Sequence, residues 1–192
     1  MTGLVVRDTW TQFTPFGQAV VLLLIQVGGL GFMAVTTMLF LALRARVSLR
    51  GRMLLAEGTG SGQIQGVVLL SQRIVALTMA CESIGALLLS IRFVPLYGWG
   101  KGIWYAVFHS VSAFCNAGFD LLGTEGAKFV SLTRYAGDPL LTTVIAALIV
   151  FGGLGFLTWE DICTYRLDFH RYRMQSKVIL VTTAFLLVLP TL

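Results

Sequence analysis

The sequence predicts an all-α integral membrane fold built from repeated units, and three observations lead to this prediction. Hydrophobic residues make up 56% of the chain and charged residues only 12%, whereas a typical soluble domain is about 25% charged. The mean hydropathy is +0.83. The string Gly-Gly-Leu-Gly-Phe occurs twice, at residues 28–32 and 152–156, each time within a long apolar segment. A repeated membrane-spanning unit usually surrounds a shared path.

Four apolar segments are candidates for membrane spans. Residues 13–43 exceed the ~20 residues that a helix needs to cross a bilayer, and residues 67–96 and 140–159 are also long enough. The fourth segment starts at Val178 and reaches Leu192, which is too short for a comfortable crossing. We therefore expect it to be the beginning of a longer span. The Gly-, Ser- and Gln-rich stretch 57–66 indicates a linker between the first two segments.

A fifth apolar segment, residues 102–115, is too short to span a bilayer. It predicts either a re-entrant helix, which enters the membrane and returns on the same side, or a helix lying at the interface. Asn116, Ala117 and Gly118 follow it directly and lead to the polar Asp120. This sequence of helix, small-residue break and polar exit favours the re-entrant interpretation.

The basic residues indicate the orientation of the chain in a cell membrane. By the positive-inside rule, the two basic clusters are expected on the cytoplasmic side: Arg44, Arg46, Arg50 and Arg52, and Arg166, Arg171, Arg173 and Lys177. Residues 97–101 and 121–138 then lie outside, and the chain crosses the membrane several times. The net charge of +5 is explained by this topology, so we expect membrane lipids as surroundings and no nucleic-acid partner. The cysteines and histidines lack metal-ligand spacing.

The segment around Gly118 has the features of a cation path. A dehydrated cation needs oxygen ligands at membrane depth, and non-helical backbone that lines a cavity supplies them as carbonyls. Glycine allows the backbone to approach an ion closely. The preceding helix would direct its partly negative C-terminal end at the ion, and Asp120 would attract cations to the pore mouth. The alternative is that Gly118 is an ordinary loop glycine, and the composition leaves both open.

The beginning of the chain has the same pattern. Thr2, Gly3 and Leu4 precede Asp8 and a long inward span, as Gly118 precedes Asp120 and another inward span. Each unit therefore reads as an outward helix, a pore helix, a filter glycine and an inward helix with a Gly-Gly pair. Asp8 becomes a second candidate for a pore mouth.

Two further features have alternative interpretations. A carboxylate in a membrane span, here Glu82, marks a functional site by default, but Ser83 and Gly85 beside it favour a hydrogen-bonded group that locks neighbouring helices. The Gly-Gly pairs indicate close packing or a bend in the inner helix, which we prefer to a gating hinge. An enzyme using Glu82 and His109 is disfavoured because no nucleophile and base are paired, so we expect no catalysis.

Three strings resemble the Ktr-type potassium uptake subunit of the Trk/Ktr/HKT superfamily. Residues 24–33 (LIQVGGLGFM) resemble its first inner helix, residues 112–120 (SAFCNAGFD) its second filter loop, and residues 2–4 (TGL) the end of its first filter loop. The resemblance implies M1–pore loop–M2 repeats around one pore, with a filter glycine from each of four repeats. About one and a half of the four repeats are expected here, and the family's gating loop and barrier arginine, which lie in the third and fourth repeats, are not expected among them.

On this resemblance the chain divides into four parts. Residues 1–52 are the end of the first filter loop and the inner helix of repeat 1, residues 53–66 are a cytoplasmic linker, and residues 174–192 begin the outer helix of repeat 3. Residues 67–173 are the complete repeat 2, with outer helix 67–96, pore helix 102–115, filter 116–120 and inner helix 138–165. The implied ion-binding backbone is that of Thr2, Gly3, Asn116, Ala117 and Gly118.

The implied function is potassium uptake across the cell membrane through a pore lined by filter carbonyls, with sodium as the coupling ion. The alternative is a non-conducting fragment of such a transporter, or an assembly partner. The resemblance also implies a homodimer of the full-length subunit and a cytoplasmic nucleotide-binding regulatory ring of the RCK (KtrA) type. No cofactor and no metal beyond transported potassium or sodium are expected.

Overall fold

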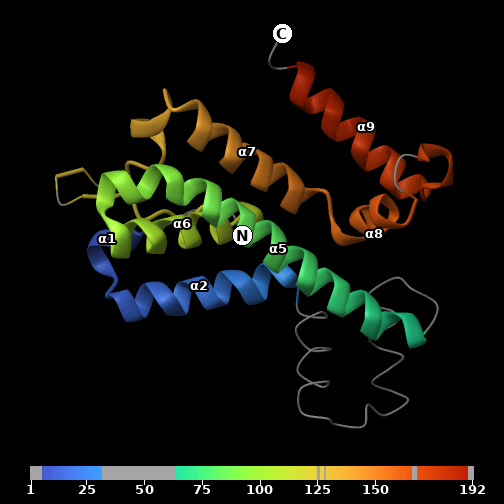
Figure 1. Cartoon of the computed structure of the whole chain (residues 1–192), viewed down its shortest axis with the longest axis horizontal. Coiled ribbons are helices and arrows are strands. Elements are labelled where there is room, and N and C mark those ends of the chain that lie inside the picture. The colour runs from blue at the N-terminus through green and yellow to red at the C-terminus, as the bar shows by residue number, and fades with distance from the viewer. Residues whose placement is uncertain (1–5, 32–63, 125, 128, 166–167, 190–192) are drawn as a thin grey trace.

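The computed structural model describes residues 6–31, 64–124, 126–127, 129–165 and 168–189, which form helices and connecting segments without a β-strand (Figure 1). The fold is therefore all-helical, as expected. Three predicted features lie outside the described residues: the filter residues Thr2 and Gly3, the first basic cluster at Arg44–Arg52, and most of the linker 53–66. The helices are α1 (Thr9–Gln12), α2 (Pro15–Leu30), α5 (Ile64–Tyr97), α6 (Trp99–Phe114), α7 (Pro139–Gly153), α8 (Phe156–Tyr165) and α9 (Met174–Val188).

One helix in the described part of the chain is by itself long and apolar enough to cross a membrane, the part of α5 from Gln72 to Tyr97. The pair α7 and α8 passes the same test if the two helices are counted as one bent span, and α2 and α9 are shorter apolar helices. α5 contains the outer helix expected over 67–96.

α6 is the central helix, enclosed by α2, α5 and α7 (Figure 1). The chain turns from α5 into α6 at Gly98, whose φ of 80° is favourable for glycine. Beyond the turn the two backbones nearly touch, because a Cβ on Gly102 would lie 2.7 Å from the carbonyl oxygen of Phe93. Phe93 and Phe108 are fully buried where α5 and α6 meet. The hydrophobic core thus surrounds the helix expected over 102–115.

The segment expected to form one inner helix over 138–165 is divided in two. Asp138 caps α7, which ends at Gly153, and α8 continues at an angle of 94°. The break contains Gly155, whose φ of 80° lies in the left-handed region that only glycine adopts at little cost. α2 ends in the same way, at Gly31 with a φ of 78°. The third glycine of both repeated strings therefore ends its helix.

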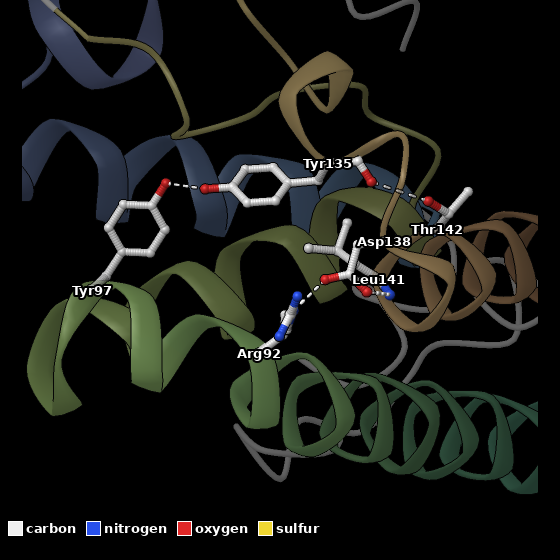
Figure 2. A network of polar contacts seen from close by, with 6 residues as sticks. All are labelled: Arg92, Tyr97, Tyr135, Asp138, Leu141 and Thr142. Carbon is white, nitrogen blue, oxygen red and sulfur yellow. Dashed lines mark hydrogen bonds and ion pairs between the residues drawn. The ribbon is translucent and has the colours of Figure 1, made fainter.

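A polar network fastens the connection between α6 and α7 to the end of α5 (Figure 2). Arg92 of α5 forms an ion pair with Asp138, and the hydroxyl groups of Tyr97 and Tyr135 are 2.5 Å apart. The hydrogen bond from Arg92 lowers the pKa of the Asp138 carboxyl below its ordinary value. This network orders the segment that leads from the candidate filter into α7.

A second network joins α8 to α9. The buried carboxylate of Asp161 accepts hydrogen bonds from the backbone N–H of Arg173, at 3.0 Å, and from the hydroxyl group of Ser176, at 2.6 Å. The side chain of Arg173 pairs with Glu160 at 3.1 Å. The direction in which α9 leaves the rest of the molecule is therefore fixed at its first turn.

Candidate functional site

The C-terminal end of α6 stops sharply in a Schellman motif. The N–H of Asn116 donates to the carbonyl of Ala113 at 3.1 Å, and the N–H of Ala117 donates to that of Ser112 at 2.8 Å. Asn116 has a φ of 51°, and asparagine is one of the few non-glycine residues that tolerate this left-handed conformation. The helix can therefore end in the protein interior with its last carbonyls partly satisfied.

After this end the chain turns back along its own helix. Gly118 has a φ of 75°. The hydroxyl group of Ser112 then donates to the carbonyl of Phe119 at 2.6 Å, and the N–H of Leu121 donates to Nε2 of His109 at 3.4 Å. Since Nε2 accepts, Nδ1 of the neutral ring carries the hydrogen and donates to the carbonyl of Tyr105 at 2.7 Å. The chain after α6 therefore returns along the helix that precedes it, and the re-entrant placement of α6 in a membrane stays a prediction.

The returning segment borders a cavity of about 210 Å³ whose walls are formed by His109, Ser112, Ala113, Asn116, Gly118, Phe119, Asp120, Ser131, Leu132, Ile145 and Ile149. Within the described residues, the carbonyl groups of Asn116, Ala117 and Gly118 accept no hydrogen bond. Asp120 is half-buried, and its carboxylate accepts from the N–H of Leu122 at 3.3 Å. Asn116, Gly118 and the carboxyl-bearing Asp120 thus border one cavity, whereas Ala117 between them is fully buried.

The structure places Asp8 differently from an open pore mouth. Asp8 is only 2% exposed. Its carboxylate caps α1 through the N–H of Thr11, at 2.9 Å, and accepts from the N–H of Phe129, at 3.2 Å. The carboxylate also fills the space beside Gly123, where a Cβ would lie 2.4 Å from Oδ1. It therefore joins the start of the chain to the loop after the candidate filter.

Both Gly-Gly pairs pack against the end of α6. A Cβ on Gly29 of α2 would lie 2.2 Å from Sγ of Cys115, and a Cβ on Gly152 of α7 would lie 1.7 Å from the carbonyl oxygen of Phe114. The close-packing interpretation is confirmed for these two glycines. The bend is confirmed at Gly155, two residues beyond the second pair. α2 and α7 thus contact neighbouring residues, Cys115 and Phe114, at the end of α6.

Glu82 lies in the same region, only 5% exposed in the middle of α5. Its carboxylate contacts Gln26 of α2 and Cys115 at the end of α6, which agrees with a hydrogen-bonded group between helices. His109 makes its hydrogen bonds elsewhere, to Tyr105 and Leu121. The part of the chain that the structure describes contains no cluster of three His, Cys, Asp or Glu residues suited to a metal ion.

Comparison with known proteins identifies the family. A family model described as a cation transport protein, TrkH, matches residues 1–191. The chain belongs to the TrkH family. The resemblance to Trk/Ktr proteins is thereby confirmed, as is a helical membrane fold. The family consists of transporters and not of enzymes.

Three curated relatives in the TrkH family show how much of the protein is matched. The potassium/sodium uptake protein NtpJ of Enterococcus hirae is 40% identical over 98% of this chain. The Ktr system potassium uptake proteins B of Bacillus subtilis and Vibrio alginolyticus are 41% identical over 97% and 38% identical over 100% of it. The chain spans 40%, 40% and 41% of the length of these three relatives.

Sequence reasoning missed three polar side chains at this site. Ser112 and Gln26 were noted only as parts of strings, and His109 was considered only for the disfavoured enzyme. Gln26 carried a usable signal, because an amide inside an apolar span requires a polar partner. Ser112 and His109 carried a weaker one, because their partners, Phe119 and Leu121, become neighbours only after the chain reverses.

Proposed function

We propose that residues 116–120 form one wall of a selective cation path, and that the complete transporter carrying this sequence takes up potassium across the cell membrane. The observation that supports this is a run of three carbonyls, from Asn116 to Gly118, that accept no hydrogen bond from the described residues and directly follow the buried end of α6. That end carries roughly half an elementary negative charge. Thr2 and Gly3 would supply the corresponding carbonyls of the preceding repeat, and Asp120 would stand at the mouth.

The finer points of this proposal rest on the relatives alone. Sodium as a coupling ion is supported by the name of the Enterococcus hirae relative, a potassium/sodium uptake protein. The two relatives named as parts of a Ktr system support only that the transporter works within a system of several components. A regulatory RCK-type ring and a homodimer of the full-length subunit are the partners that we propose for it. The chain then acts within a larger membrane assembly.

Substitution of Gly118 tests the proposal. Residues 1–191 would replace the matching part of the Bacillus subtilis relative, and the chimera would be expressed in cells that lack potassium uptake. Gly118→Ser should lower discrimination of potassium from sodium about tenfold, because a side chain in the left-handed region costs ~1–2 kcal/mol. Uptake of rubidium as a potassium tracer, with and without competing sodium, measures it.

The matched control is Gly126→Ser. Gly126 is exposed in the loop after the candidate filter, with nothing within 4 Å of an added Cβ, so uptake should stay as in the parent chimera. Equal potassium affinity and sodium competition in the Gly118→Ser and parent chimeras would refute the filter. A chimera that inserts and assembles but does not conduct would favour the alternative, a non-conducting assembly partner.

A further inference from the structure

Glu82 is the acidic group buried within α5, and its carboxylate connects three helices. Oε1 accepts a hydrogen bond from Nε2 of Gln26 in α2 at 3.1 Å. The same oxygen is 3.7 Å from Sγ of Cys115, whose thiol donates to it. α2 belongs to repeat 1, whereas α5 and α6 belong to repeat 2. A single carboxylate oxygen therefore links two repeats at the end of the pore helix.

The surrounding packing leaves this contact little freedom. Cys115 is wedged between the carboxylate of Glu82 and the backbone of Gly29, where a Cβ would lie 2.2 Å from its sulfur. The hydroxyl group of Ser110 in α6 also donates to the backbone carbonyl of Glu82, at 2.7 Å. Glu82 of α5 thus accepts hydrogen bonds through both its main chain and its side chain, from Ser110 in α6 and from Cys115 at its end.

Cys115 is also the last residue before the candidate filter. It caps α6 and directly precedes Asn116, the residue whose left-handed conformation turns the chain. Any displacement of Cys115 is transmitted to Asn116 through one peptide bond. The position of the first filter carbonyls therefore depends on what holds Cys115 in place.

We propose that Glu82 is a positioning residue for the filter, which, through Gln26, aligns the filter of repeat 2 with the inner helix of repeat 1. The inference rests on the proposed function, since it assigns Glu82 a role in selectivity and not only in stability. A carboxylate that merely held helices together would change the amount of folded protein and leave ion discrimination per molecule unaltered.

The test uses four variants of the chimera described above, with uptake normalised to the amount of protein in the membrane. Glu82→Gln keeps an oxygen that accepts from Gln26 and Cys115, so potassium over sodium discrimination should stay near the parent value. Glu82→Leu removes the acceptor and should lower discrimination about fivefold. Gln26→Leu should lower discrimination by a similar factor. The double variant should lower it little further than Glu82→Leu alone, because both single substitutions remove the hydrogen bond between Gln26 and Glu82.

Thr78→Val is the matched control. Thr78 lies one turn before Glu82 on α5, is 1% exposed, and its hydroxyl group has no partner among the described residues, so its removal should leave discrimination unchanged. If Glu82→Leu fails to accumulate, Gln26→Leu decides, because that amide is only half-buried. Parent-like discrimination in Gln26→Leu, with or without Glu82→Leu, overturns the inference.

The Gly118→Ser variant separates this inference from the proposed function. A loss of discrimination in Gly118→Ser, with parent-like values in the Glu82 and Gln26 variants, overturns only the positioning role. Parent-like values in all of them overturn the filter itself and the positioning role with it.

Discussion

At the scale of single residues, the candidate filter is shaped by two side chains of α6 that border the same cavity and hydrogen-bond the returning backbone. Ser112 ties down the carbonyl of Phe119, and His109 holds the N–H of Leu121. Both side chains are buried, at 3% exposure each. The Ser112 bond occupies the carbonyl of Phe119, whereas the carbonyls of Asn116, Ala117 and Gly118 accept no hydrogen bond from the described residues.

Removal of the Ser112 hydroxyl tests this arrangement. Ser112→Ala should lower potassium over sodium discrimination about fivefold, because the loss of one buried hydrogen bond corresponds to about 1 kcal/mol. Tracer uptake with sodium competition measures it. Ser90→Ala is the control, since the Ser90 hydroxyl bonds only the carbonyl of Leu87 in its own helix. Equal discrimination in both variants would contradict a positioning role for Ser112.

At the scale of helices, the two Gly-Gly pairs determine how closely the inner helices approach α6. Gly152 of α7 faces the backbone of Phe114, whereas the atom nearest to a Cβ on its neighbour Gly153 is Nδ2 of Asn116 at 3.9 Å. Two adjacent glycines thus have unequal roles. The first is required by contact with another backbone, and the second has room for a side chain.

Alanine substitutions distinguish the two glycines. Gly152→Ala should lower the free energy of unfolding by ~1–3 kcal/mol, because the added Cβ overlaps a backbone carbonyl. Gly153→Ala should raise it by up to ~1 kcal/mol, since alanine has the higher helix propensity. Thermal unfolding of the purified chimera in detergent measures both. Equal shifts for the two variants would show that the contact with Phe114 does not limit the packing.

Sequence reasoning predicted where the helices lie better than how they end. The position of α5 follows from the apolar run 67–96, and that of α6 from the short apolar segment 102–115, although α6 begins earlier, at Trp99. The break after α7 could not be predicted from hydropathy, because residues 140–159 are apolar throughout. Its cause is the backbone conformation at Gly155. The burial of Asp8 could not be predicted from the sequence, because it depends on Phe129 and Gly123, which are distant in sequence.

At the scale of the whole molecule, the two polar networks lie at opposite ends of the helices. The first network lies where α5 ends and α7 begins, and it consists of Arg92, Asp138, Tyr97 and Tyr135. The second network, around Asp161, lies at the end of the molecule where α8 meets α9 (Figure 1). The charge pattern predicts that the first end faces outward and the second faces the cytoplasm.

Labelling of single cysteines in intact cells tests this orientation. With the native cysteines of the chimera replaced, Thr133→Cys should react with a membrane-impermeant thiol reagent, because Thr133 is exposed at the expected outer end. Gln175→Cys, exposed at the start of α9, should react only after the cells are permeabilised. The reverse pattern would invert the topology and remove Asp120 from the outer mouth.

The contact between Gly29 and Cys115 has a consequence for symmetry. In the proposed repeat architecture, it joins the inner helix of one repeat to the pore helix of the next, so the two surfaces that meet are different and the interface is heterologous. Interfaces of this kind either close into a ring or extend without limit. Around the proposed ion path they would close, and each pore helix would then contact its own inner helix and the preceding one. In that architecture, a substitution at one such junction would displace the pore helix of the neighbouring repeat as much as the inner helix of its own repeat.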